Sequence, residues 1–145
     1  MTALIQRLRK EEKGLTLIEL LAVIVIIGII AAIAVPLITG MLDKTKENAR
    51  VATANQLFEA AKLRSIAQKN GVLEGQHKLS DLIGENYIQA GLTDPKTGKS
   101  FGDGTTVNLD NITTTNPVVS LVVDGETFNY TVEQLTKSTE TAKTS

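Results

Sequence analysis

One stretch of the chain constrains its fold more than any other. Residues 20–42 contain no charged side chain, and nearly every position from Leu15 to Leu42 is apolar. A helix over residues 20–42 is roughly 34 Å long, enough to cross a hydrocarbon core of about 30 Å. The sequence therefore predicts a membrane-spanning helix near the N-terminus.

The segment before this run is short and cationic. It reads MTALIQRLRKEEKG, and a basic flank of this kind stays on the cytoplasmic side, so we expect the rest of the chain to face outward. A secretory signal peptide is the competing interpretation, because Ala32 and Ala34 form a small-x-small cleavage pattern. Its apolar region would be only about 7 to 15 residues long, however, whereas the run here is longer and continues into a polar helical segment.

Residues 43–70 are predicted to continue the same helix. They contain no proline or glycine and are rich in good helix formers, and Asn70-Gly71 provides a stop signal, with the glycine in the left-handed conformation. The apolar positions form two stripes, which indicates two packing partners: the chain's own C-terminal domain and a neighbouring subunit, or two sides of one domain. The stripes are Ala49, Ala52, Ala60, Leu63 and Ala67, and Val51, Ala54, Phe58 and Ala61.

The C-terminal part, residues 71–145, has the composition of a small globular domain. Ser80 is predicted to cap a short helix over residues 81–90. Asp124-Gly125 is suited to a tight hairpin turn, and we expect the tail over residues 137–145 to fray. Strands are predicted over residues 105–109, 118–123 and 127–132. The predicted fold class is α+β.

The junction between the leader and the apolar run reads KGLTLIELL, from Lys13 to Leu21. It resembles the N-termini of the type IV pilin and pseudopilin family, and the similarity is strong through Asn70 and weak beyond it. The resemblance implies that a prepilin peptidase cuts between Gly14 and Leu15, and that the new amino group of Leu15 is N-methylated. Leu15 departs from the phenylalanine usual at this position. It also implies a pilin fold, with a long helix packed on a small antiparallel sheet.

Glu19 matches the family's acidic position, and its chemistry supports the resemblance. A carboxylate in an apolar helix costs about 3 kcal/mol at the bilayer centre and less near the interface, so it needs a partner. Cleavage after Gly14 creates one, because the freed amine of Leu15 is positive and lies four residues away on the same helix face. In the resembled family the acid neutralises the amine of an adjacent subunit. The alternative is a carboxylate that extends to the lipid headgroups.

Gly28 and Pro36 lie inside the apolar run and weaken its helix, since proline removes a backbone hydrogen bond. A simple kink is one interpretation. The resemblance implies more, because these positions match the glycine and proline that bound the segment losing helix in assembled pili. We expect a loosened stretch between them in a filament, sheltered by neighbouring helices.

Other polar residues give weaker signals. His77, the only histidine, lies in a polar segment without a catalytic partner at a recognisable spacing, which indicates an ordinary surface residue. Asp94, Asp103 and Asp110 match no calcium-loop spacing, so we interpret them as turn formers and predict no metal or cofactor. The basic residues of the polar helix are interleaved with acids, which favours a mixed solvated or intersubunit face: Lys44, Lys46, Arg50, Lys62 and Arg64.

The composition argues against several classes of function. The formal net charge of -1 gives no global attraction to nucleic acid, and the absence of cysteine rules out disulfides and thiol chemistry. The resemblance implies a non-enzymatic filament subunit that polymerises with itself, aided by a prepilin peptidase, an assembly ATPase and an inner-membrane platform. The combination of Glu19 with a medium-sized soluble domain favours a major pilin. It would be a single-pass membrane protein before assembly and an extracellular filament afterwards. Its parts would be a leader (1–14), a filament-core helix (15–42), an amphipathic helix (43–70) and a globular domain (71–145).

Two alternatives remain open. The chain can be a pseudopilin of a type II secretion or competence DNA-uptake apparatus, which would use the same junction. It can also be a single-span membrane protein whose outer domain binds a ligand. That class would need neither cleavage after Gly14 nor an acid at Glu19.

Overall fold

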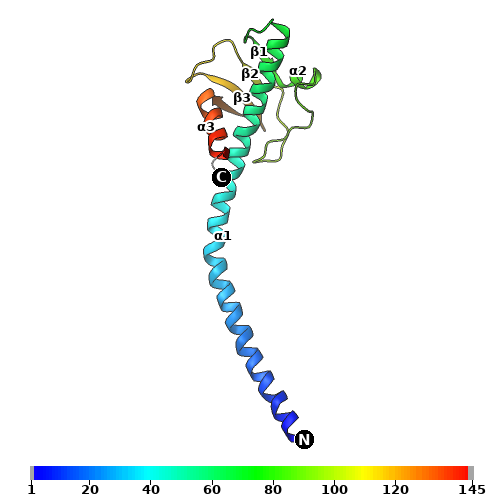
Figure 1. Ribbon diagram of the computed structural model, residues 1–145, viewed down its shortest axis with the longest axis vertical. Coiled ribbons are helices and arrows are strands. Elements are labelled where there is room, and N and C mark those ends of the chain that lie inside the picture. Colours follow the sequence, from blue (N-terminus) through cyan, green and yellow to red (C-terminus); the bar gives the residue numbers. More distant parts are fainter. Residues whose placement is uncertain (1, 144–145) are drawn as a thin grey trace. The chain divides into compact units, whose positions relative to one another are not determined.

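The computed structural model describes the backbone of residues 2–143 and the side chains of residues 16–137. The chain divides into two compact units, Met1–Leu42 and Asp43–Ser145. Figure 1 follows the chain by colour and labels most of its elements. In order these are α1 (Thr2–Gln68), β1 (Gln76–Lys78), α2 (Leu79–Gly84), β2 (Thr106–Asn108), β3 (Pro117–Val123), β4 (Glu126–Thr131) and α3 (Val132–Lys143).

The four strands form one antiparallel sheet in the order β1-β2-β3-β4. The β3–β4 hairpin closes where Val123 pairs with Glu126, and the two residues between them, Asp124 and Gly125, have φ values of 54° and 84°. Positive φ at both positions is what a two-residue hairpin turn of the favoured hand requires. The predicted α+β fold, a long helix packed on a small antiparallel sheet, is confirmed.

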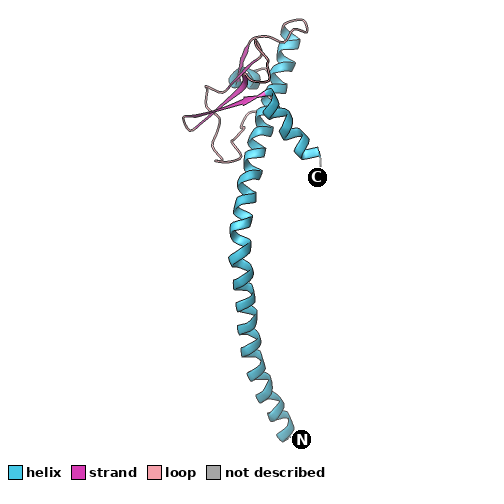
Figure 2. Ribbon diagram, turned by 90° about the vertical axis from the view of Figure 1, so that its left-hand side faces the viewer, coloured by secondary structure: helices cyan, strands magenta, loops and turns pink. Residues whose placement is uncertain are grey.

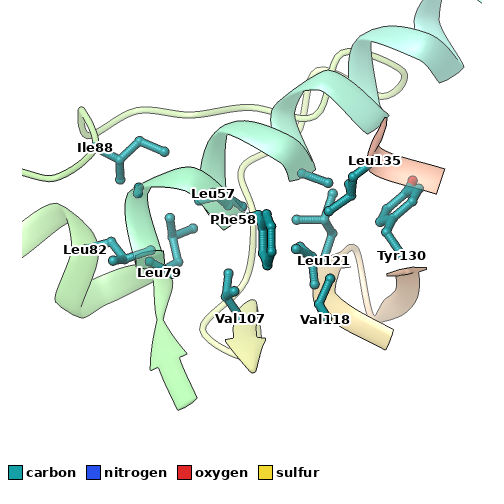
Figure 3. Close-up of a cluster of buried hydrophobic side chains, with 14 of the residues drawn as sticks. Leu57, Phe58, Leu79, Leu82, Ile88, Val107, Val118, Leu121, Tyr130 and Leu135 are labelled. Carbon is teal, nitrogen blue, oxygen red and sulfur yellow. The ribbon is translucent and has the colours of Figure 1, made fainter. Parts of the chain in front are cut away.

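The core of the second unit lies between the later turns of α1 and the sheet. Figure 3 shows Leu57 and Phe58 of α1 among side chains from the strands, such as Val107 and Leu121. Successive strand residues alternate between the two faces, so Val119, Leu121 and Val123 of β3 all point inward. The other fully or nearly fully buried apolar residues are Ala54, Ala60, Ala61, Leu79, Leu82, Ile88, Phe101, Leu109, Val118, Tyr130 and Leu135.

Helix α1 ends in a tightly hydrogen-bonded turn. Asn70 has φ 52°, and the backbone N–H of Gly71 donates to the carbonyl of Ile66 at 3.0 Å, as in a Schellman motif. Both Asn70 and Gly71 adopt positive φ, whereas we expected the left-handed residue to be the glycine. The buried hydroxyl of Ser65 then donates to the carbonyls of Val72 (2.8 Å) and Glu74 (3.0 Å), which fixes the following loop against the helix.

The short helix differs from its prediction at both ends. α2 begins at Leu79, its N-cap residue is Lys78, and no side chain caps it, so the predicted capping role of Ser80 is wrong. It also ends at Gly84 rather than Ala90, because Asn86 takes a left-handed φ of 62° that a helix cannot continue. The residues from Glu85 to Thr105 are therefore mostly loop, drawn in pink in Figure 2.

The C-terminal tail is helical where we expected fraying, since α3 continues to Lys143. A reciprocal capping box starts this helix. The Oε1 atom of Gln134 accepts from the N–H of Thr131 at 2.9 Å, and the Thr131 hydroxyl accepts from the N–H of Gln134 at 3.4 Å. Leu135 is buried and anchors the first turn to the core. Strand β1 was not predicted, because its three residues are too few for a recognisable alternation.

Candidate assembly helix and its anchoring domain

The predicted processing residues, Gly14 and Leu15, lie outside the part of the chain whose side chains the structure describes. Their proposed cleavage and methylation stay predictions. The first described residue after them is Thr16, and the apolar surface starts at Leu17.

Glu19 is the only charged residue in the stretch 16–42, and its side chain is exposed. Within the described part of the chain its carboxylate has no hydrogen bond or ion pair. An ion of this kind on an apolar helix is stable only beside water, a lipid headgroup or a positive group. The carboxylate is therefore available to a partner that the described residues do not supply.

The rest of this stretch is an unburied apolar surface. Every large apolar side chain from Leu17 to Leu42 is more than half exposed, and Leu17 reaches 73%. Full burial of one such side chain stabilises a protein by about 1.5 to 3 kcal/mol, so leaving all of them in water is strongly unfavourable. Among the described residues, the segment Thr16–Gln68 is long and apolar enough to cross a membrane by length and composition.

Gly28 and Pro36 both lie within the continuous α1 helix. A side chain added at Gly28 would meet no neighbouring atom within 4 Å, so this position is open for close approach by another helix. Near Pro36 the hydroxyl of Thr39 donates to the carbonyls of Pro36 (2.9 Å) and Val35 (3.3 Å). The loosened stretch was predicted for a filament, and it stays a prediction.

The polar half of α1 presents its two apolar stripes differently. Ala54, Phe58 and Ala61 are buried in the core, and Val51 is half-buried against it. On the other stripe, Ala52, Leu63 and Ala67 are exposed, and only Ala60 is buried. The second unit therefore covers one face of this helix segment and leaves the other open, rather than enclosing it from both sides.

Arg50 joins the helix to the loop that follows Thr93, which corrects its assignment to a mixed solvated face. Its side chain is buried and makes a bidentate ion pair with Asp94, with both N–O distances at 2.6 Å. The guanidinium carbon also lies 4.1 Å from the ring centroid of Phe128, within cation–π range. Arg50 thus ties together α1, the loop and β4.

Asp94 organises its own turn as well, as predicted. Its Oδ2 atom accepts hydrogen bonds from the Thr97 hydroxyl (2.8 Å) and the Thr97 N–H (3.0 Å). The hydrogen bond from Arg50 holds the pKa of the Asp94 carboxyl well below its usual range, with a further contribution from Thr97. The group therefore stays ionised although it is fully buried.

His77 is buried, not an ordinary surface residue. Its Nδ1 atom lies 2.9 Å from Nη1 of Arg64, and its Nε2 atom lies 3.2 Å from the carbonyl oxygen of Glu74. Arg64 also donates two hydrogen bonds to Glu85, at 2.6 and 3.0 Å, and these hold the pKa of the Glu85 carboxyl below its usual value. Arg64 is therefore held in place by His77 and by Glu85, and its pair with the exposed Glu85 is part of a mixed charged face.

Among the remaining polar candidates, Asp110 and Lys62 make hydrogen bonds or ion pairs. Asp110 accepts a hydrogen bond from the N–H of Gly75 at 2.6 Å, which closes a loop as predicted for a turn former. Lys62 pairs with Glu59 at 3.0 Å on the exposed side of α1, consistent with a mixed charged face there. Among the described residues, no group of three or more acidic or histidine side chains is placed to hold a metal ion.

Comparison with known proteins adds one match. A family model described as the prokaryotic N-terminal methylation motif matches residues 9–35. The matched region contains Gly14, Leu15, Glu19 and Gly28, and Pro36 follows it directly. No curated protein and no solved structure matches the chain significantly. The motif points to a structural protein rather than an enzyme.

Proposed function

Because the prokaryotic N-terminal methylation motif matches residues 9–35, we propose that the chain is a type IV pilin-like protein with a class III signal and that it is the major structural subunit of a type IV pilus. One observation carries the proposal beyond the motif. Residues 16–42 form an exposed apolar helix that carries a single charge, at Glu19. Such a helix needs lipid before assembly and the same helix of other subunits afterwards.

In this proposal the chain has four parts. Residues 1–14 are a leader, residues 15–42 anchor the subunit and later form the filament core, and residues 43–70 and 71–145 form the outer part. Subunits add head to tail through a heterologous contact that does not close, and such a contact generates a fibre. The prepilin peptidase, assembly ATPase and membrane platform supply the chemistry and the work.

Glu19 gives the assembly its proposed register. Cleavage between Gly14 and Leu15 frees an amine, and Glu19 of one subunit neutralises the amine of the next. A charge-assisted contact is strong in an apolar surrounding, because an unpaired ion there is costly. The unpartnered carboxylate of Glu19 supports this role. Loosening between Gly28 and Pro36 would then adjust the length of the core helix.

Electron microscopy of the sheared surface fraction tests the proposal. The natural chain is expected to form long fibres, and Glu19→Ala is expected to insert in the membrane normally but to form few or none. Glu126→Ala is the matched control, because Glu126 is an exposed carboxylate of the second unit and should leave fibres unchanged. Normal fibres from Glu19→Ala would refute the proposed register. Absence of long fibres from the natural chain would refute the major-pilin role and leave the pseudopilin role.

A further inference from the structure

A groove of about 870 Å³ opens on the second unit beside α1. Helix α1 contributes Gln56 to its lining, and the rest comes from α2 and the loop that follows it. Three of the lining side chains are amides, one is a tyrosine, and none is charged. The lining includes Gln56, Ile83, Asn86, Tyr87, Ile88 and Gln89.

The walls of this amide groove are held in place by the core. Ile88 is buried, and its backbone N–H donates to the carbonyl of Leu82 at 3.2 Å. The backbone N–H of Tyr87 donates to the same carbonyl at 2.9 Å. Asn86 is fixed in a left-handed conformation and donates its N–H to Ile83 at 3.1 Å. Gln56 precedes the fully buried Leu57 on α1. The backbone beneath the groove is therefore preformed, whereas the side chains of Gln56, Asn86 and Gln89 are exposed on it.

The three amides have no other role within the described part of the chain. The side chains of Gln56, Asn86 and Gln89 make no hydrogen bond to any described residue. Each amide offers two N–H donors and a carbonyl acceptor. The groove thus presents donors and acceptors together, with an aromatic ring beside them.

The groove also lacks a net charge. Glu85, next to Asn86 in the chain, does not supply one, because its carboxylate is bonded by Arg64 and by the side-chain amide of Gln68 at 2.8 Å. A site for phosphate or carboxylate ligands would require cationic or strongly donating groups, and a site for amines would require acids. A neutral ligand rich in hydroxyl groups fits this lining best.

We propose that the amide groove binds a neutral saccharide. Each sugar hydroxyl both donates and accepts a hydrogen bond, so neighbouring hydroxyls match the paired donor and acceptor of an amide. The half-buried Tyr87 offers apolar ring surface to the C–H face of a sugar. All lining residues belong to the second unit, and none of them is among the residues proposed to set the assembly register.

Saturation-transfer NMR on the full chain tests the proposal, in micelles of a detergent whose headgroup carries no sugar. The probes are chitotriose and maltotriose, which distinguish N-acetylated from unsubstituted sugars, and trigalacturonate as the acidic counterpart. We expect saturation transfer to at least one neutral probe, with binding weakened about tenfold in the double variant Gln56→Ala/Gln89→Ala. Asn86→Gly should weaken it too, because glycine tolerates the left-handed backbone at this position and removes the side chain that carries the amide.

Asn48→Ala serves as the matched control, since Asn48 is an exposed amide on α1 outside the groove. It should bind like the natural chain, and all variants should share one unfolding midpoint. The proposal is overturned if neither neutral probe shows transfer, if the double variant binds as tightly as the natural chain, or if trigalacturonate binds as well as the neutral probes. None of these results bears on whether fibres form.

Discussion

Residues 16–42 and residues 43–68 belong to one helix, α1, yet among the residues whose side chains the structure describes only the second half contains buried ones. In the second half, Leu57 and Phe58 are buried by the sheet, and Arg50 has a specific ionic partner. In the first half, no residue is buried, and Glu19 is the only ion. Both halves have the same helical backbone, so the difference in burial between them comes from their side chains.

The difference shows where each half must find its stability. The second half has alternating apolar and polar faces, so its own domain can cover the apolar one. The first half is apolar on all sides, which is typical of a helix surrounded by lipid or by other helices. Its partners are therefore other molecules, and the N-terminal methylation motif that overlaps it agrees with a subunit of an assembly.

Removing residues 1–42 should have the largest effect. We expect the remaining chain to be a soluble, folded monomer, because its whole described core comes from Asp43–Ser145. Filament formation should be lost completely. Sedimentation velocity and near-ultraviolet circular dichroism would check this. Aggregation, or unfolding without a cooperative transition, would show that the domain formed by residues 43–145 needs residues 1–42 in order to fold.

The substitution Asp94→Asn should have the next largest effect. The substitution leaves the buried guanidinium of Arg50 without its counter-ion, which typically costs about 3 to 5 kcal/mol in the free energy of unfolding. Urea denaturation would measure the loss. Asp124→Asn removes the exposed partner of Lys99 and is the matched control, for which we expect about 0 to 1 kcal/mol. Equal effects would contradict the anchoring role of Arg50.

A pair of leucines compares the two halves directly. Leu57→Ala removes a fully buried side chain and should lower the free energy of unfolding of the second unit by about 2 to 5 kcal/mol. Leu37→Ala, in the first half, should leave it unchanged, because Leu37 is 65% exposed. Thermal unfolding of both variants in the same micelles would decide. A comparable loss from Leu37→Ala would mean that the first half also stabilises the domain.

Acid should weaken the second unit by a smaller amount. The pKa of Asp94 is lowered in the folded state, so its contribution is complete above the unfolded pKa of about 3.9 and is lost as pH falls below it. The contribution should shrink by about 1 kcal/mol at pH 3. The measurement is the difference in unfolding free energy between the natural chain and Asp94→Asn. A difference independent of pH down to 3 would contradict the ionised pair.

The parts of the fold that were predicted correctly carry local signals. The uncharged apolar run, the helix formers of residues 43–70 and the Asp124-Gly125 turn each specify a conformation within a few residues. Resemblance to a known family added the roles of Gly14 in processing and Glu19 in assembly, which local patterns do not suggest and which stay predictions. The α3 helix was missed although it has a local signal, because Thr131 and Gln134 have the spacing of a capping box.

The errors about Arg50 and His77, by contrast, arose from contacts between distant residues. Arg50 and Asp94 are 44 positions apart, and nothing in their surrounding sequence shows that the loop folds back onto the helix. His77 lies in a polar segment, and only its pairing in β1 and its contact with Arg64 make it buried. The amide groove likewise combines one helix residue with a loop more than two dozen positions later. Such sites exist only once the chain has folded.

The most direct test of a processed filament subunit is the intact mass and N-terminal sequence of the mature protein. We predict a chain that begins at Leu15, lacks residues 1–14 and carries one methyl group on its new amine. A chain that retains residue 1, or one cut after Ala34 as a secretory signal would be, would contradict the account.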